Sequence, residues 1–169
     1  MPAAHTLYLV RHAIAAERGD KWPDDADRPL THEGASRMRQ VVEGLEALDV
    51  TIDLVVTSPL RRAVETAEIV AAGFDPAPDV ITAAALAPGG APSRVADVLG
   101  AHGKARRIAI VGHEPGLGEL AAWCIGARCP LPFKKGGIAQ LEAPEWPPAR
   151  HTCTLVWMAT PRMLRALAK

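Results

Sequence analysis

Short runs of Val, Ile and Leu alternate along this chain with segments in which apolar residues recur every three or four positions. The runs have the length and composition of buried strands, and the longer segments have the period of helices that pack one face on a sheet. Parallel strands need a crossover between them, and a helix is the usual crossover. The alternation therefore predicts an α/β fold, a three-layer α/β/α sandwich around a mostly parallel sheet.

Turn and cap residues mark where these segments begin and end. Pro23 and Pro29 exclude a long helix after the first strand, so residues 17–28 are expected to form a polar loop. Six strands are expected, at residues 6–11, 53–57, 80–83, 107–111, 137–141 and 152–158.

Hydroxyl residues and prolines mark the helix starts. Thr31 is the expected cap of a first helix, whose buried face runs from Met38 to Leu48. Ser58, as the cap, and Pro59 begin a second helix that continues to about residue 72. Three more are expected, at residues 95–102, 117–125 and 160–169, the last with Leu164 and Leu167 facing inward.

Length and charge narrow the class of protein. The 169 residues suffice for one hydrophobic core, so a single domain over residues 1–169 is expected. Lysine plus arginine balances aspartate plus glutamate at 19 each, which leaves no chain-wide positive field for nucleic acid or an anionic membrane. The first apolar run, residues 6–10, is too short for a signal peptide or a membrane span, so a cytoplasmic protein is expected.

Nothing in the pattern of ligand-type residues predicts a metal or redox site. Cys124, Cys129 and Cys153 lack C-x-x-C spacing and have apolar neighbours, which predicts buried, inert thiols and no disulfides. His, Asp and Glu do not cluster as metal ligands, so neither a metal nor another cofactor is expected.

Basic side chains follow three of the predicted strands. Arg11 and His12 end the first strand, the second leads to Arg61 and Arg62, and the strand at 107–111 leads to His113. The carboxyl ends of parallel strands meet at one edge of a sheet, where ligands bind. Cations crowded there repel one another, and a bound anion relieves that repulsion. The pattern predicts a phosphoryl-binding site.

Each side chain then has an expected role. Arg61 and Arg62 fall in the first turn of a helix, where the helix dipole already favours an anion, and Arg62 is the one expected to face inward. Guanidinium groups bind phosphoryl oxygens with paired hydrogen bonds. His12 is the expected nucleophile, kept neutral by the charge of Arg11, and His113 the expected hydrogen-bond donor to a phosphoryl oxygen.

At these residues the sequence resembles the histidine phosphatase superfamily, the phosphoglycerate-mutase-like enzymes. The matching strings are LYLVRHA, RPLTHEG, VVTSPLRRAVETAE and IVGHEPGL, and the closing WMATPRMLRALAK is most similar to SixA-type phosphohistidine phosphatases. The resemblance implies a phosphoglycerate-mutase-like fold and a phosphate pocket of Arg11, His12, Arg62 and His113. It also implies that His12 becomes phosphorylated during turnover.

Other residues are candidate substrate contacts. Arg28 stands where SixA-type chains carry Arg, and it either reaches the phosphate or substrate from the loop or pairs with the Asp-rich stretch. Ser58 and Glu17 are further candidates. Lys134 and Lys135 either contact an acidic partner or belong to a solvated loop.

The sequence departs from the family pattern at two places, and the second departure bears on the substrate. Ala13 stands where the family usually has Gly, so the turn needs an ordinary backbone conformation or tolerates a small strain. Residues 81–93 contain no carboxylate, whereas many relatives place a proton donor there. Imidazole leaves without strong acid assistance, which favours phosphohistidine on a protein partner, with Glu17 as a fallback acid.

Three alternatives remain. The first is a small-molecule phosphomonoesterase of the same superfamily, and the second a phosphohistidine-binding module without turnover. The third is a dinucleotide site at Gly116, Gly118 and Ala121, which fits G-x-G-x-x-A. It fits poorly because it follows a four-residue turn late in the chain, and a P-loop is excluded because no G-K-[ST] follows.

Overall fold

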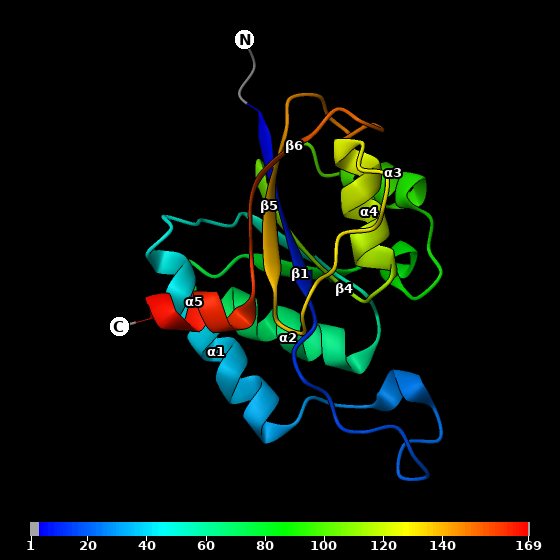
Figure 1. Cartoon of the computed structure of the whole chain (residues 1–169), viewed down its shortest axis with the longest axis vertical. Helices are drawn as coiled ribbons and strands as arrows, with labels where there is room; N and C mark the ends of the chain where they lie inside the picture. The colour runs from blue at the N-terminus through cyan, green and yellow to red at the C-terminus, as the bar shows by residue number, and fades with distance from the viewer. Residues whose placement is uncertain (1–3, 169) are drawn as a thin grey trace.

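The computed structural model describes residues 4–168, and within them the strands form one twisted sheet (Figure 1). The strand order is β3-β2-β4-β1-β5-β6, and among these strands β5 is the one that runs in the opposite direction to the others. The mostly parallel sheet is confirmed. The strands are β1 (His5–Arg11), β2 (Leu54–Thr57), β3 (Asp79–Thr82), β4 (Arg107–Gly112), β5 (Ile138–Ala143) and β6 (Thr154–Ala159).

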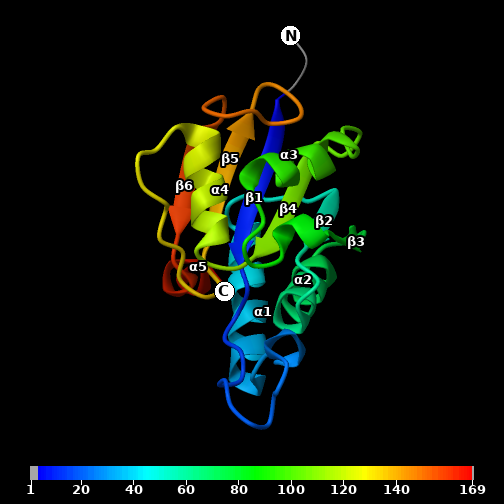
Figure 2. The ribbon, with the colours of Figure 1, turned by 90° about the vertical axis from the view of Figure 1, so that its right-hand side faces the viewer.

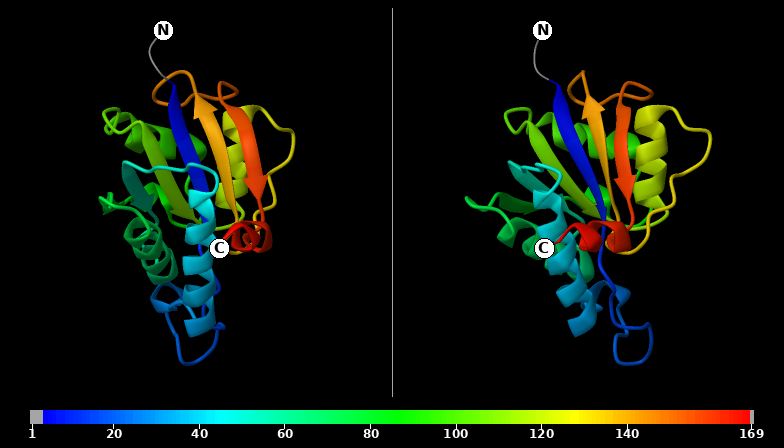
Figure 3. Two further views of the ribbon diagram at one scale, coloured as in Figure 1. Left: turned by 90° about the vertical axis from the view of Figure 1, so that its left-hand side faces the viewer. Right: turned by 60° about the vertical axis from the view of Figure 1, so that its left-hand side comes forward.

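Helices cover both faces of the sheet, which confirms the three-layer sandwich (Figures 2 and 3). Helices α1, α2 and α5 lie on one face, and α3 and α4 on the other. No helix in residues 4–168 has both the length and the apolar composition needed to cross a bilayer. The helices are α1 (His32–Glu46), α2 (Arg61–Ala72), α3 (Pro92–Gly100), α4 (Gly116–Ile125) and α5 (Pro161–Leu167), with short 3-10 turns η1 (Asp25–Asp27) and η2 (Ala84–Leu86).

The two cores arise from the alternation of side chains along the central strands. In β1, Leu7 and Leu9 pack in the core beneath α3 and α4, whereas Tyr8 and Val10 pack beneath α1 and α2. Successive strand residues point to opposite faces, so a strand covered on both sides must be apolar throughout. This is why the strands read as continuous apolar runs in the sequence.

Helix α1 begins as the sequence predicts and crosses α5 at close range. The hydroxyl of Thr31 accepts a hydrogen bond from the Gly34 N–H at 2.9 Å, which caps the helix. Near its other end, a Cβ on Gly44 would lie 1.9 Å from the carbonyl oxygen of Leu164 in α5. The contact between these helices therefore requires a residue without a side chain.

Two predicted helix boundaries are wrong. Leu48 is 38% exposed, because α1 ends at Glu46 and the chain turns through Asp49, at a positive φ, out of the helical phase. Ser58 is not a cap, because the N-cap position falls on Leu60, whose backbone is extended, and α2 begins at Arg61. Its hydroxyl serves the candidate site instead.

Two burial predictions also fail. Leu167 is 40% exposed, because it ends α5 one turn beyond Leu164, the residue buried against α1. Cys129 is exposed in the connection after α4, whereas Cys124 and Cys153 are buried as expected. In both cases the residue has apolar neighbours in the sequence but lies beyond the residues that pack in the core.

We expect Gly44→Ala to destabilise the protein, since the added methyl group would overlap a backbone atom of α5 that cannot move alone. Overpacking of this kind costs about 1–3 kcal/mol in the free energy of unfolding, which chemical denaturation measures. Gly19→Ala is the matched control, because a Cβ at Gly19 meets nothing within 4 Å. Equal stability of the two variants would show that α5 does not pack on α1 as described.

Candidate active site

Three strands end at the same level of the sheet. Arg11 pairs with Gly112 across β1 and β4, and Thr57 pairs with Val111 across β2 and β4. The backbone continues this pairing, since the His12 N–H donates to the Gly112 carbonyl at 3.1 Å. The chain ends of β1, β2 and β4 therefore bring His12, Ser58 and His113 to one edge of the sheet.

His12 is buried and has a defined tautomer. Its Nδ1 lies 2.7 Å from the carbonyl oxygen of Ala13, which can only accept, so Nδ1 carries the proton and Nε2 carries a lone pair. Burial lowers the pKa of His12 to about 3; the Ala13 carbonyl opposes this, and the charges of Arg62 and Arg11 add to it. The imidazole is therefore neutral near pH 7, with Nε2 available as a nucleophile.

His113 faces His12 across the site. The two ring centroids lie 5.1 Å apart, and Nε2 of His113 lies 2.7 Å from the Ser58 hydroxyl oxygen. Burial, together with the nearby Arg62 charge, lowers the pKa of His113 to about 4. His113 is thus a neutral imidazole, oriented by Ser58, that donates through one nitrogen only.

Arg62 and Arg28 lie together on one carboxylate. Arg62 is 4% exposed, and its Nη1 and Nη2 donate to the backbone oxygen and Oδ2 of Asp25 at 2.9 and 3.0 Å. Nε of Arg28 donates to Oδ1 of the same residue at 3.0 Å. Burial raises the pKa of Asp25, but the hydrogen bond from Arg28 and the charges of the arginines outweigh it and hold the pKa below its ordinary value.

Of the two alternatives for Arg28, the structure shows the ion pair with the Asp-rich loop, and Arg28 is buried. Its contact with the phosphate or substrate stays a prediction. Sequence reasoning missed Asp25, because it is one of several acids in that loop and nothing local distinguishes it.

Arg11 is held from the opposite side. Its Nη1 donates to the Phe133 carbonyl at 2.7 Å. Burial lowers the pKa of Arg11, and the charge of Glu114 opposes that shift. The Glu114 carboxylate accepts the N–H groups of Gly118 and Phe133, at 2.8 and 3.4 Å, and so fastens the segment that holds Arg11.

Thr66 is a further residue that the sequence reasoning missed. It is fully buried on α2; its hydroxyl accepts from the Ala13 N–H at 3.1 Å and donates to the Arg62 carbonyl at 2.7 Å. Apart from Arg62, the other buried residues of α2 are apolar, so a second polar residue on this face was the available signal. Ala13 needs no strained backbone, since Asp49 and His151 are the non-glycine residues at positive φ between residues 4 and 168.

Two sequence candidates lie apart from this cluster. Glu17 is exposed on the loop and forms no ion pair in the described part of the chain. Arg61 points outward, as expected, and pairs with Glu65 at 2.7 Å.

The dinucleotide alternative does not fit the geometry. A Cβ on Gly118 would lie 2.2 Å from the Leu131 carbonyl oxygen, so this glycine permits close packing of α4 on a loop. Its N–H is already bonded to Glu114. The helix end that a pyrophosphate would use is therefore occupied by a protein carboxylate.

The cluster is suited to an oxyanion. Four side-chain nitrogens in residues 4–168 are buried without a hydrogen-bond partner: Nε of Arg11, Nε of Arg62 and Nδ1 of His113 in this cluster, and Nε of Arg165 on α5. Buried unpaired polar groups are costly, and the oxygens of one tetrahedral anion accept several hydrogen bonds. The site thus combines a neutral nucleophilic nitrogen with guanidinium groups that stabilise negative charge.

The chain is similar to known proteins over most of its length. A family model described as the histidine phosphatase superfamily (branch 1) matches residues 7–87, which include Arg11, His12 and Arg62. An uncharacterized protein from Picosynechococcus sp. is 40% identical over 142 residues, covering 81% of this chain and 84% of the relative.

Solved structures share the fold. The protein histidine phosphatase SixA complexed with tungstate superposes with a TM-score of 0.81 at 25% identity, covering 94% of this chain and 99% of that one. A mycobacterial glucosyl-3-phosphoglycerate phosphatase superposes with a TM-score of 0.68 at 18% identity, covering 93% and 100%.

We expect the free energy of unfolding to fall as the pH is lowered from 6.5 toward 4. His12 and His113 have folded pKa values of about 3 and about 4 against 6.5, so the unfolded chain takes up protons first and is favoured. At pH 5 each contributes a loss of about 2 kcal/mol.

Denaturation of His12→Gln between pH 5 and 6.5 measures this contribution, and the variant should lose about half of the pH dependence. His32→Gln, at an exposed position on α1, is the control and should retain it. An unchanged slope in His12→Gln would mean that His12 is protonated in the folded protein.

Proposed function

The chain belongs to the histidine phosphatase superfamily and is a phosphatase, and we propose that it dephosphorylates phosphohistidine on a protein partner through a phosphorylated His12. The observation that carries this proposal is the Nδ1 hydrogen bond from His12 to the Ala13 carbonyl. It leaves the Nε2 lone pair free on a neutral imidazole among guanidinium groups. These are the requirements of a histidine nucleophile toward a phosphoryl group.

In the first step, Nε2 of His12 attacks phosphorus. The substrate ring carries a proton on the nitrogen that is not bonded to phosphorus. A new P–N bond forms, the P–N bond of the substrate breaks, and its electron pair returns to the ring nitrogen, so the substrate histidine leaves as neutral imidazole. Arg11 and Arg62 stabilise the charge on the phosphoryl oxygens, and His113 donates a hydrogen bond to them. One P–N bond replaces another, so the step depends mainly on positioning and charge.

In the second step, water attacks the phosphorus of phospho-His12. The P–N bond breaks, its electron pair returns to Nε2, and inorganic phosphate leaves. The Ala13 carbonyl keeps the Nδ1 proton in place throughout, so His12 returns to the same neutral tautomer. No external cofactor is needed for the atoms and charges to balance.

In the described part of the chain, the carboxylates that lie at the site, those of Asp25 and Glu114, already have hydrogen-bond partners, and this supports phosphohistidine as the substrate. Residues of the carboxylate-free segment 81–93, Ala85 and Gly90 among them, line a small cavity together with His113. The carboxylate next to His113, that of Glu114, is occupied by two backbone N–H groups. Imidazole, with a pKa of about 6.5, is a far better unassisted leaving group than an alkoxide.

A small phosphate ester is the second candidate. The fold is shared with a SixA protein histidine phosphatase and with a glucosyl-3-phosphoglycerate phosphatase, so the fold by itself does not select the substrate. Direct comparison of substrates decides between the two candidates.

We expect incubation with a labelled phosphodonor to give an acid-labile, alkali-stable phosphoenzyme that His12→Ala does not form. Wild-type protein should release phosphate faster from a phosphohistidine protein than from a small ester or a sugar phosphate. Faster cleavage of the ester would reject the substrate, whereas a protein that binds vanadate but never turns over would be a binding module.

Adjacent arginines provide a matched pair of variants. Arg62→Ala should lower kcat/KM by about 10²–10³, as removal of an oxyanion-stabilising donor does. Arg61→Ala, one residue earlier, removes an exposed group paired with Glu65 and should change kcat/KM by no more than a few-fold. Steady-state kinetics with one substrate measures both, and a similar loss in the two variants would contradict the site.

A further inference from the structure

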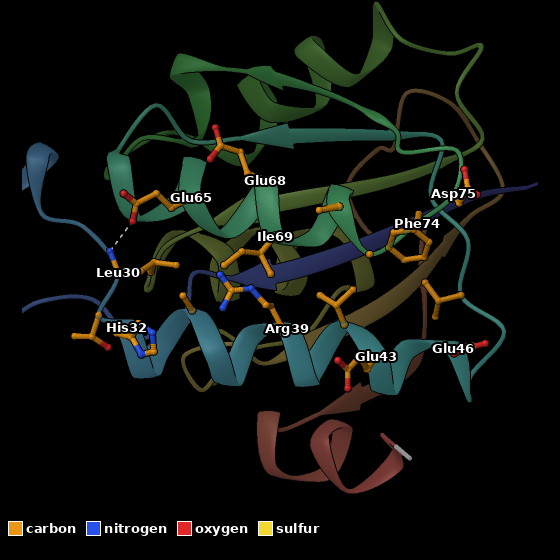
Figure 4. Close-up of a pocket in the computed structure, with 16 residues that line it drawn as sticks. Leu30, His32, Arg39, Glu43, Glu46, Glu65, Glu68, Ile69, Phe74 and Asp75 are labelled. Carbon is orange, nitrogen blue, oxygen red and sulfur yellow. Dashed lines mark hydrogen bonds between the residues drawn. The ribbon is translucent and has the colours of Figure 1, made fainter.

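A groove runs between α1 and α2 on the outer surface of the helical layer (Figure 4). Its volume is about 840 Å³, far larger than that of the small cavity beside His113. The two helices flank it side by side, and their 15 and 12 residues give walls of roughly 18–22 Å. The mechanism proposed above does not use this groove.

The floor of the groove is apolar. Val42 and Val50 are buried beneath it, and Ile69 and Phe74 are half-buried and lie toward its interior. Figure 4 shows Ile69 near its centre and Phe74 near one end. Apolar side chains that line an elongated groove provide contacts for the apolar stripe of a partner.

The rim of the groove is acidic although the chain has no net charge. Arg39 and His32 are the basic residues among the lining residues that the structure describes. The acidic residues that line the groove are Glu43, Glu46, Glu65, Glu68 and Asp75. The local charge therefore favours a basic occupant and opposes an anionic lipid surface.

One end of the groove adjoins the phosphoryl site. Glu65 lies one helical turn after Arg62 on α2, and its Oε2 accepts the Leu30 N–H at 2.7 Å. Leu30 in turn follows the buried Arg28 by two residues. A partner lying along the groove would therefore extend to the guanidinium groups that bind its phosphoryl group.

We propose that this groove docks a basic amphipathic helix of the phosphorylated partner protein, next to its phosphohistidine. The inference rests on the function proposed above and names the kind of protein that carries the substrate. The walls are helices, whose interior backbone groups bond to one another, so they offer no edge on which an extended peptide forms a ladder. A helix with an apolar stripe flanked by Lys or Arg matches both the floor and the rim.

Two labelled 14-residue peptides test the docking directly by fluorescence anisotropy. Both carry Leu at a helical spacing of three and four residues, and the other positions are Lys in one peptide and Glu in the other. The wild-type protein should bind the Lys peptide, with affinity that falls as salt rises, and not the Glu peptide.

Charge-reversal variants test whether the Lys peptide binds in the groove. The double variant E43K/E68K changes one exposed rim residue on each wall and should weaken binding of the Lys peptide about tenfold. The control E119K/E142K reverses two exposed charges, on α4 and β5, and should bind as the wild type does. Equal binding of the two peptides, or equal loss in both variants, would overturn the docking site.

Measurements of enzyme kinetics distinguish a failure of the docking site from a failure of the proposed function. With a Lys-rich peptide that carries phosphohistidine, E43K/E68K should raise KM about tenfold, while hydrolysis of p-nitrophenyl phosphate should stay unchanged. An unchanged KM for the peptide would reject the groove and leave the phosphatase assignment standing. A wild-type protein that binds the Lys peptide but dephosphorylates neither substrate would reject the function and leave the groove standing.

Discussion

The candidate site gathers guanidinium groups at one edge of the sheet. Their positive charge must be largely balanced by other groups for the protein to be stable. Arg28 and Arg62 are buried, and Asp25 bonds to both. The two histidines contribute no further charge, because burial lowers their pKa values to about 3 and about 4. A buried array of cations is tolerable only with such compensation, and it still leaves donors that suit an arriving anion.

A chain of hydrogen bonds connects this charged array to His12, the proposed nucleophile. The carbonyl of Arg62 accepts from Thr66, Thr66 accepts from the Ala13 N–H, and the Ala13 carbonyl accepts from Nδ1 of His12. The helix that supplies the guanidinium group therefore also orients the peptide that sets the tautomer. In the proposed mechanism, phosphoryl binding and nucleophilic attack would both depend on this short segment of α2.

The same helix connects two surfaces of opposite charge. Arg62 lies buried in the proposed phosphoryl site at the first turn of α2, and the acidic, apolar-floored groove begins one turn later at Glu65. A partner that carries a phosphoryl dianion next to a basic helix would complement the basic site with the dianion and the acidic groove with the helix. The arrangement would select a phosphorylated protein over a small ester by contacts made outside the site of chemistry.

The sequence by itself determined the order of strands and helices, the mostly parallel sheet and the meeting of Arg11, His12 and His113. These features depend on local periodicity and on the rule that parallel strands end together. Only the tertiary structure decided that Asp25 holds Arg62, 37 residues away, that Ser58 orients His113 instead of capping α2, and that α1 and α2 leave a groove. Contacts between distant segments depend on how helices pack in space, and a local pattern of residue types does not encode that packing.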